Sequence, residues 1–142
     1  MYLIDTNVIS EKRKRYRANH GVIRFFKQAA ENNDRLYLSA MTIGELRRGV
    51  ELIRNRGDLS QARMLETWLE VILVEYGNRI LDFTAAEAQV WGRLQAPRAQ
   101  NIIDKQIAAI ALTFDLILVT RNIRDCVTTG VRLFNPFESV TS

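Results

Sequence analysis

The sequence predicts a three-layer α/β/α fold with a parallel sheet of four or five strands. Short apolar segments of strand length alternate along the chain with longer amphipathic segments of helix length. A helix between two successive strands implies that the strands are parallel and joined by a right-handed crossover. The 142 residues show no repeat, low-complexity stretch or Pro/Gly-rich linker. We therefore expect a single domain over residues 1–142.

The predicted strands are apolar runs next to residues that favour turns. We place them at residues 1–4, 36–39, 80–83 and 116–120, with an edge strand at 131–134. The polar residues 5–7 end the first strand, and the run Asn-Asn-Asp at 32–34 is a strong breaker before the second.

The predicted helices carry apolar residues at helical spacing. They cover residues 21–31, 42–53, 58–73, 84–95 and 103–114. Asp58 is a favoured residue for a helix start. Thr42 and Glu45 match the capping-box pattern, and Thr84 and Glu87 repeat it.

The composition argues against several classes of protein. Asp5 interrupts the first apolar run and the basic cluster comes after it, which disfavours a secretory signal peptide. The longest apolar region, residues 102–119, is broken by charged residues, which argues against a membrane span. The lone cysteine, Cys126, cannot form an internal disulfide. We therefore expect a cytoplasmic protein without membrane contact.

The net charge of +4 comes from twenty basic residues, of which sixteen are arginine. The planar guanidinium suits phosphate and stays charged at any working pH. A solvated surface would account for this charge equally well. Charge therefore permits a nucleic-acid substrate without demonstrating one.

Acidic and amide side chains gather at the predicted carboxyl edge of the sheet, where open parallel sheets form their sites. Asp5 follows the first strand directly, and Glu45 lies in the first turn of the helix after the second strand. Asp104 opens the helix before the fourth strand, and Asn122 and Asp125 follow that strand. Five carboxylate or amide side chains thus map to one edge.

Each of these acids also has a purely structural interpretation. Asp5 could cap a short helix, and Glu45 could complete a capping box with Thr42. Asp104 could favour its helix through the helix dipole alone. The joint arrangement is harder to explain in this way, because neighbouring carboxylates raise one another's pKa values.

A divalent cation would remove the cost of gathering these carboxylates. Oxygen ligands suit Mg²⁺ or Mn²⁺, whereas zinc is disfavoured because the chain has one Cys and one His. Such a metal can lower the pKa of a bound water and stabilise charge on a phosphate under attack. The acidic set therefore indicates metal-dependent phosphodiester chemistry.

Other chemistries lack the residues they need. His20 follows the basic cluster and is interpreted as a surface residue in a loop, so no Ser-His-Asp set forms. No Gly-rich phosphate loop occurs. A phosphatase with an aspartate nucleophile would need a second Asp two residues after Asp5, but that position is Asn7.

Four segments resemble PIN-domain proteins and, among these, the VapC toxins of bacterial toxin–antitoxin pairs. They are "MYLIDTNVISE", "LYLSAMTIGELRRGVE", "IIDKQIAAIAL" and "LILVTRNIRD", in the family's order over nearly the whole chain, and the closing "LFNPFE" also fits. The resemblance implies a metal-dependent endoribonuclease that uses Mg²⁺ or Mn²⁺. Its action would be to cleave a structured RNA, such as a tRNA or an rRNA loop, and to inhibit translation.

The resemblance also implies which residues form the active site. Asp5, Glu45 and Asp104 match the three family carboxylates, with Asp5 and Asp104 the most direct metal ligands and Glu45 completing the shell or steering the attacking water. Many members carry a fourth acid where this chain has Asn122, so Asp125 is the nearest acid for that catalytic role. The positions expected to support the ligands or to hold metal-bound waters are Thr6, Asn7, Thr120 and Asn122. The candidates for the RNA backbone are Arg47, Arg48, Arg121 and Arg124.

The resemblance further implies partners. A VapB-like antitoxin would lay an apolar helix on the toxin and present a basic residue to the carboxylates. The apolar residues considered for this contact are Ile9, Leu46, Val50 and Ile53, each of which could equally be plain core. A homodimer and a toxin–antitoxin hetero-oligomer are implied as well. The alternative function is a catalytically inactive PIN-like RNA-binding or regulatory module in which the acids serve only as caps.

Overall fold

A computed structural model describes residues 1–138 and shows five parallel strands in the order β3-β2-β1-β4-β5. The strands are β1 (Tyr2–Ile4), β2 (Leu36–Ser39), β3 (Ile80–Leu81), β4 (Ile117–Val119) and β5 (Leu133–Phe134). The central strand β1 pairs with β2 on one side and with β4 on the other. The predicted five-stranded version of the sheet is therefore confirmed. Residues 139–142, which the predicted domain includes, lie outside the described residues.

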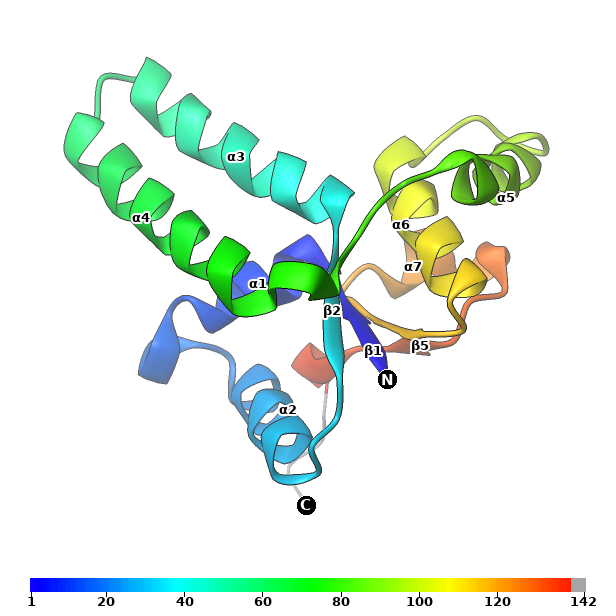
Figure 1. Ribbon diagram of the computed structural model, residues 1–142, viewed down its shortest axis with the longest axis horizontal. Helices are drawn as coiled ribbons and strands as arrows, with labels where there is room; N and C mark the ends of the chain where they lie inside the picture. The colour runs from blue at the N-terminus through cyan, green and yellow to red at the C-terminus, as the bar shows by residue number, and fades with distance from the viewer. Residues whose placement is uncertain (139–142) are drawn as a thin grey trace.

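Helices cover both faces of the sheet (Figure 1). The helices are α1 (Thr6–Lys12), α2 (His20–Glu31), α3 (Ala40–Asn55), α4 (Leu59–Tyr76), α5 (Ala85–Gln95), α6 (Ile102–Thr113) and α7 (Ile123–Cys126). Short 3₁₀ helices lie at Arg15–Arg17, Gly77–Arg79, Val127–Thr129 and Pro136–Glu138. Figure 1 shows α3 and α4 side by side on one side of the strands, with α5 and α6 on the other. In the described part of the chain, no helix is both long and apolar enough to cross a membrane.

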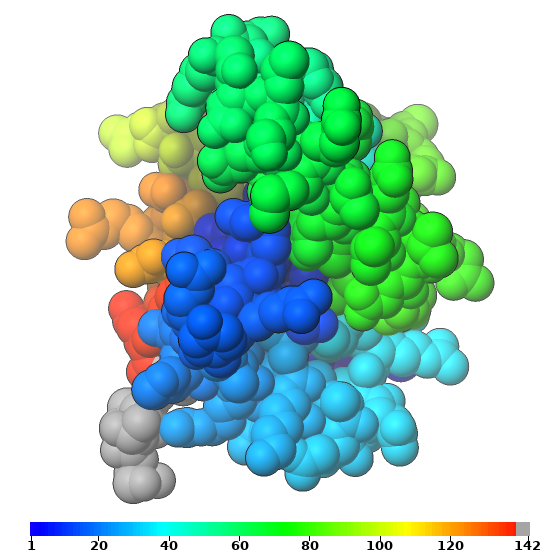
Figure 2. Space-filling model, turned by 90° about the vertical axis from the view of Figure 1, so that its left-hand side faces the viewer, coloured from blue at the N-terminus to red at the C-terminus, as the bar shows by residue number. Residues whose placement is uncertain are grey.

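The first core layer lies between the sheet and helices α1 to α4. Alternate residues of the strands, such as Ile4, Leu38 and Val119, point into this layer and are fully buried. They pack against Val50 of α3 and Leu69 of α4. In Figure 2, α1 (blue) lies between the green α3–α4 pair above and α2 below.

The second core layer lies between the other face of the sheet and α6. Leu3 and Leu118 alternate with the residues of the first layer and contact Ile107 and Ile110. The alanines of α6, including Ala108 and Ala111, are fully buried and let the helix approach the sheet closely. Both faces of the sheet are thus covered, as parallel sheets require.

The start of α3 differs from the prediction. The helix begins at Ala40, and Ser39 caps it by accepting a hydrogen bond of 3.0 Å from the backbone N–H of Thr42. The predicted capping box of Thr42 and Glu45 is therefore wrong. The second pattern, Thr84 with Glu87, does form a capping box, at α5. The same local pattern has two outcomes because only Thr42 is buried by tertiary contacts.

Two smaller predictions also need correction. His20 is the first residue of α2 rather than part of a loop, because Asn19 caps that helix by accepting from the N–H groups of Gly21 and Val22. The side chain of His20 is nevertheless exposed, as predicted. Asp5, for which a capping role was one of two interpretations, does cap α1.

Candidate active site

The carboxyl edge of the sheet is formed by the residues that follow β1, β2 and β4. Asp5 follows β1 directly, and its N–H donates to the carbonyl of Val119 over 2.9 Å. Thr120 follows β4, and α3 starts immediately after β2. Since β1 lies between β2 and β4, the first residues after all three strands meet around Asp5.

The Asp5 carboxylate is 3% exposed and is held by hydroxyl and amide donors. Thr120 Oγ1 donates to Asp5 Oδ2 over 2.6 Å, and Thr6 N–H donates to Oδ1 over 2.8 Å. Burial raises the pKa of Asp5 above its ordinary value of 3.8, and the nearby Glu45 charge raises it further, although the hydrogen bonds act in the opposite direction. Asp5 is thus a buried acid for which a cation would be a favourable neighbour.

Glu45 is fixed by a short chain of hydroxyl groups. Thr6 Oγ1 donates to Glu45 Oε1 over 2.5 Å. The Thr6 and Thr42 hydroxyl oxygens lie 3.0 Å apart, and Ser39 Oγ donates to Thr42 Oγ1 over 3.2 Å. Glu45 therefore turns toward Asp5 instead of back to the start of its own helix, which excludes the capping interpretation for this residue.

Asp104 approaches the same edge from the first turn of α6. Burial raises the pKa of Asp104, and the charges of Asp5 and Asp125 raise it further, whereas a hydrogen bond with the side chain of Asn122 lowers it. Asn122 and Asp125 thus both neighbour Asp104. The acids that the sequence placed at this edge therefore influence one another in pairs, Glu45 with Asp5 and Asp104 with Asp5 and Asp125.

The hydroxyl groups of Thr6 and Thr120 donate to carboxylates of the site, Glu45 and Asp5 respectively. The resemblance implies that these positions support the ligands or hold metal-bound waters. Asn7 contacts Asp5 Oδ2 at 3.4 Å through its amide nitrogen and accepts from the N–H of Arg121 over 3.1 Å. These contacts orient the carboxylates and tie the end of β1 to the end of β4.

Sequence reasoning missed Ser39 and the site role of Thr42. Both are fully buried and belong to the hydroxyl chain that leads to Glu45. One signal was present, because Ser39 ends the second strand at the same edge as Asp5. Thr42 was interpreted only as a cap, since its neighbour Thr6 is distant in sequence.

The donor set suits a hard divalent cation. None of the four carboxylates forms an ion pair with a basic side chain within residues 1–138. The nearby thiol of Cys126 offers no thiolate, because burial, reinforced by the carboxylates, raises its pKa to about 12. Among the described residues, no three Asp, Glu, His or Cys side chains are gathered closely enough to ligate one ion. One or two carboxylates together with waters, the shell that Mg²⁺ favours, fit this geometry.

The four arginines predicted to contact RNA lie in different surroundings. Arg47 Nη1 is paired with Glu66 at 2.6 Å and with Glu51 at 3.2 Å, so its guanidinium is already engaged. Arg48 is exposed on α3. Arg121 lies over the ring of Phe137, with its Cζ 4.6 Å from the ring centroid. Arg124 lines a cavity that also includes Asp125.

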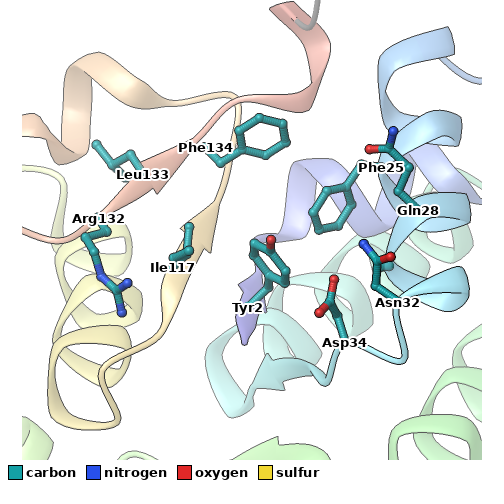
Figure 3. A pocket seen from close by; sticks show the side chains of 10 residues that line it. Tyr2, Phe25, Gln28, Asn32, Asp34, Ile117, Arg132, Leu133 and Phe134 are labelled. Carbon is teal, nitrogen blue, oxygen red and sulfur yellow. The ribbon is translucent and has the colours of Figure 1, made fainter.

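A further cavity, of about 400 Å³, lies far from these acids. Figure 3 shows it between α2 and the strands, with Phe25 and Phe134 on its walls. Its lining includes Tyr2 and Ile117, which are the first residues of β1 and β4. The cavity therefore belongs to the amino edge of the sheet, opposite the carboxylates.

The fold and the site define a class: a parallel α/β domain that gathers carboxylates at the carboxyl edge of its sheet. A family model of the PIN domain matches residues 2–125. The chain therefore belongs to the PIN-domain family, and the predicted resemblance is confirmed.

Several curated relatives match along nearly the whole chain. Plasmid stability protein StbB of Pseudomonas syringae pv. tomato is 34% identical, with 98% of this chain and 100% of that protein covered. Toxin FitB of Neisseria gonorrhoeae is 32% identical, with 96% and 99% covered. VapC ribonuclease Y4jK of Sinorhizobium fredii is 30% identical, with 97% and 99% covered.

Among solved structures, FitAcB from Neisseria gonorrhoeae superposes with a TM-score of 0.84 at 32% identity, covering 98% of this chain and 100% of that chain.

Proposed function

We propose that the protein is a Mg²⁺- or Mn²⁺-dependent endoribonuclease that acts as the toxin of a toxin–antitoxin pair. The observation that carries this proposal is the set of carboxylates around Asp5, which have hydroxyl and amide donors but no basic partner among the described side chains. The names of two relatives, a toxin and a VapC ribonuclease, support the same activity. Cleavage of a tRNA or an rRNA loop in the cytoplasm would then inhibit translation.

A bound divalent cation would supply charge stabilisation on the phosphate and a water of lowered pKa. Asp5 and Asp104 would hold it most directly. Thr120 orients Asp5 through its hydroxyl, and Asn122 orients Asp104 through its amide. Glu45 accepts from Thr6 through Oε1, and within the described residues its Oε2 has no recorded partner, so this oxygen is available to steer the attacking water. Asp125 would act through a water from the far side of Asp104.

The test is the metal-dependent loss of a labelled structured RNA. We expect cleavage with Mg²⁺ or Mn²⁺, no cleavage with EDTA, and recovery when the metal is restored. An Asp5→Asn variant removes the charge while keeping the shape and should be inactive under all these conditions. The matched control is Asp58→Asn, because Asp58 also caps a helix but lies away from the site. Cleavage by the wild type in EDTA, or wild-type rates from Asp5→Asn, would refute the proposal.

One observation favours the alternative of a catalytically inactive RNA-binding module. The fourth acidic position of many family members is Asn122 in this chain, and no three carboxylates form a ready-made shell in the described region. The same experiment separates the two functions. An inactive module would bind the RNA but leave it intact at every metal concentration.

We further propose that an antitoxin covers the carboxylates from a neighbouring groove. This groove, of about 190 Å³, lies between α1, α3 and α4 and includes Glu45 at one end. Leu46, Val50 and Ile53 line it, and Leu46 and Val50 also belong to the hydrophobic core. Ile9 is fully buried and lines an adjacent cavity instead of this groove.

The antitoxin proposal predicts a stable complex with a small partner, encoded nearby, that has an apolar helix and a basic residue. Co-purification of that partner with the chain, together with loss of RNA cleavage, would support it. A Gly49→Trp variant would fill the groove at a helical position with open space around it and should weaken the complex. Unchanged binding by that variant would contradict the assignment of the groove. The implied homodimer is to be checked by the mass of the free toxin in solution.

A further inference from the structure

Another cavity, which includes Asp125, has four basic residues in its lining. It has a volume of about 720 Å³, within the usual range for ligand sites of roughly 300–1,000 Å³. Its walls come from the end of α5, the connection to α6, the first turn of α6, and α7 with the turn after it. The charged residues of its lining are Arg93, Arg98, Lys105, Arg124 and Asp125. Four cations therefore face one carboxylate, and we call this feature the basic cavity.

The position of the basic cavity follows from the first turn of α6. Consecutive residues of a helix point about 100° apart, so neighbouring side chains reach different surroundings. Asp104 lies at the carboxylate edge, where the charges of Asp5 and Asp125 raise its pKa. Lys105, the next residue, lines the basic cavity. Asp125 belongs both to the carboxylate edge and to the lining of the basic cavity, so the cavity adjoins that edge.

Lys105 is the most informative residue of the cavity. The residue is only 5% exposed, and its Nζ donates to the backbone carbonyl of Arg98 over 2.7 Å. No ion pair with a carboxylate is recorded for it among residues 1–138. A buried ammonium group without a counter-charge is costly, and an anion in the cavity would supply that charge.

The other cations are available for the same anion. Arg93, Arg98 and Arg124 have exposed side chains, and no ion pair is recorded for them in the described structure. They differ in this from Arg47 and Arg54, whose guanidinium groups are occupied by glutamates. The α5–α6 connection that carries Arg98 is tied by a hydrogen bond of 3.0 Å from Gln100 N–H to the Arg98 carbonyl.

The start of α6 lies beside the cavity. Asn101 precedes the helix in the left-handed conformation, with φ of 54°, and makes no side-chain capping bond. The first N–H groups of α6 therefore have no side-chain cap, and a helix start of this kind favours negative charge. Asn101 itself lines the cavity.

We propose that the basic cavity binds consecutive phosphates of a single-stranded RNA segment beside the bond that the carboxylates act on. The proposal rests on the ribonuclease function proposed above and adds Arg93, Arg98 and Lys105 to its substrate contacts. A chain of phosphates suits several separate cations around one cavity, and unpaired RNA is the form that a protein can hold in a groove.

The test measures the salt dependence of RNA binding. The probe is a fluorescent twelve-nucleotide oligouridine, and Asp5→Asn is the background so that the probe stays intact. The double substitution Arg93→Ala with Arg98→Ala removes two exposed guanidinium groups and keeps the backbone carbonyl that Lys105 uses. Each phosphate contact contributes about 0.7 to the slope of log K against log salt for single strands, so the slope should fall by about 1.4. The matched control, Arg17→Ala with Arg63→Ala, also removes two exposed arginines and should leave the slope unchanged.

Cleavage kinetics of the same substitutions in the active protein provide the second measurement. We expect KM for RNA to rise at least about tenfold with kcat close to wild type, because phosphate contacts of this kind position the substrate. Equal slopes and equal KM values would overturn the proposal while leaving the nuclease function intact. A reduced slope in a protein that never cleaves RNA would support the cavity and refute the nuclease instead. Loss of inorganic phosphate binding with unchanged RNA affinity would show an anion site unrelated to RNA, and it would also overturn the proposal.

Discussion

Two groups of carboxylates in this protein have opposite electrostatic surroundings. Between α3 and α4, Glu66 is bound by Arg47 at 2.6 Å and by Arg54 at 3.0 Å, and Glu51 is bound by the same two arginines. These hydrogen bonds lower the pKa values of both glutamates. At the sheet edge, burial and neighbouring acids raise the pKa values of Asp5 and Asp104.

The contrast shows how a functional site is distinguished from a structural ion-pair network. The α3–α4 network satisfies its charges internally and joins two helices on the protein surface. The sheet edge leaves like charges together, an arrangement that a cation would stabilise and that is typical of functional sites. Acidic residues alone do not distinguish a functional site from an ion-pair network, since both regions contain them. The presence of basic partners distinguishes the ion-pair network.

The largest effect should come from Asp104→Asn. We expect RNA cleavage to fall at least about 1000-fold, since a metal-bound site contributes several kcal/mol to the transition state. The metal-free protein should melt at a higher temperature than wild type, because the substitution removes one of the mutually repelling charges. Initial rates with Mg²⁺ and thermal melts in EDTA measure the two effects. Reduced stability together with full activity would reverse our assignment of the site.

Binding of a divalent cation should stabilise the protein through the sheet edge and not through the α3–α4 network. A metal at about 100 times its Kd would add about 2.7 kcal/mol to the free energy of unfolding. Asp5→Asn should abolish this stabilisation, whereas Glu66→Gln should preserve it. Thermal melts across a Mg²⁺ or Mn²⁺ titration would show the difference.

The pH dependence of that stabilisation should also separate the two regions. The folded-state pKa values of Asp5 and Asp104 lie above 3.8, so without metal these groups favour the folded state at low pH and lose that contribution as pH rises through the raised values. Metal binding needs the deprotonated forms, so the shift in melting temperature should shrink as pH falls toward the same range. Glu51 and Glu66 have lowered pKa values, so their contribution is present above 4.5 and is lost only at lower pH. A metal effect that is constant down to pH 4 would contradict this account.

A smaller effect is expected from Thr120→Val, which keeps the shape of the side chain but removes the hydroxyl group that donates to Asp5. Groups that orient metal ligands typically contribute about 10- to 100-fold to affinity or activity. We therefore expect cleavage to fall by about that factor, with partial recovery at high metal concentration. Thr113→Val is a suitable control, because Thr113 Oγ1 donates to the Ala109 carbonyl within its own helix. A loss that no metal concentration reduces would show that Thr120 acts in another way.

The smallest effect should come from Glu66→Gln in the α3–α4 network. Exposed ion pairs contribute little and are screened by salt, so the melting temperature should change slightly at low salt and less at high salt. RNA cleavage should be unchanged. If this substitution lowered cleavage as strongly as Asp104→Asn, the separation of the two regions would be wrong.

Much of this site could be predicted from the sequence. Asp5 directly follows an apolar strand, and Asp104 opens a helix before another strand, so the parallel topology alone placed both acids at one edge. The same reasoning placed Asn122 and Asp125 at this edge. In the structure, both residues affect the pKa of Asp104. The reasoning succeeded because strand ends are set by local hydrophobic patterns.

The hydrogen-bond partners of these acids could not be predicted in this way. Thr120 and Asp5 are 115 residues apart in sequence, and Thr6 and Glu45 are 39 apart, so no local pattern links them. The capping-box prediction for Glu45 failed for this reason, since a tertiary hydroxyl competed successfully with the backbone of its own helix. Arg47 is a similar case, because its partner Glu66 lies on the next helix.

The amino-acid sequence therefore determined the order of strands and helices and the edge at which the acids collect, because hydrophobic periodicity and turn residues act over short distances. The folded chain determined which oxygen meets which donor and which arginines remain available. Those outcomes depend on contacts between distant segments. The same contacts separate the paired glutamates of α3 and α4 from the carboxylates around Asp5, which have no basic partner within residues 1–138.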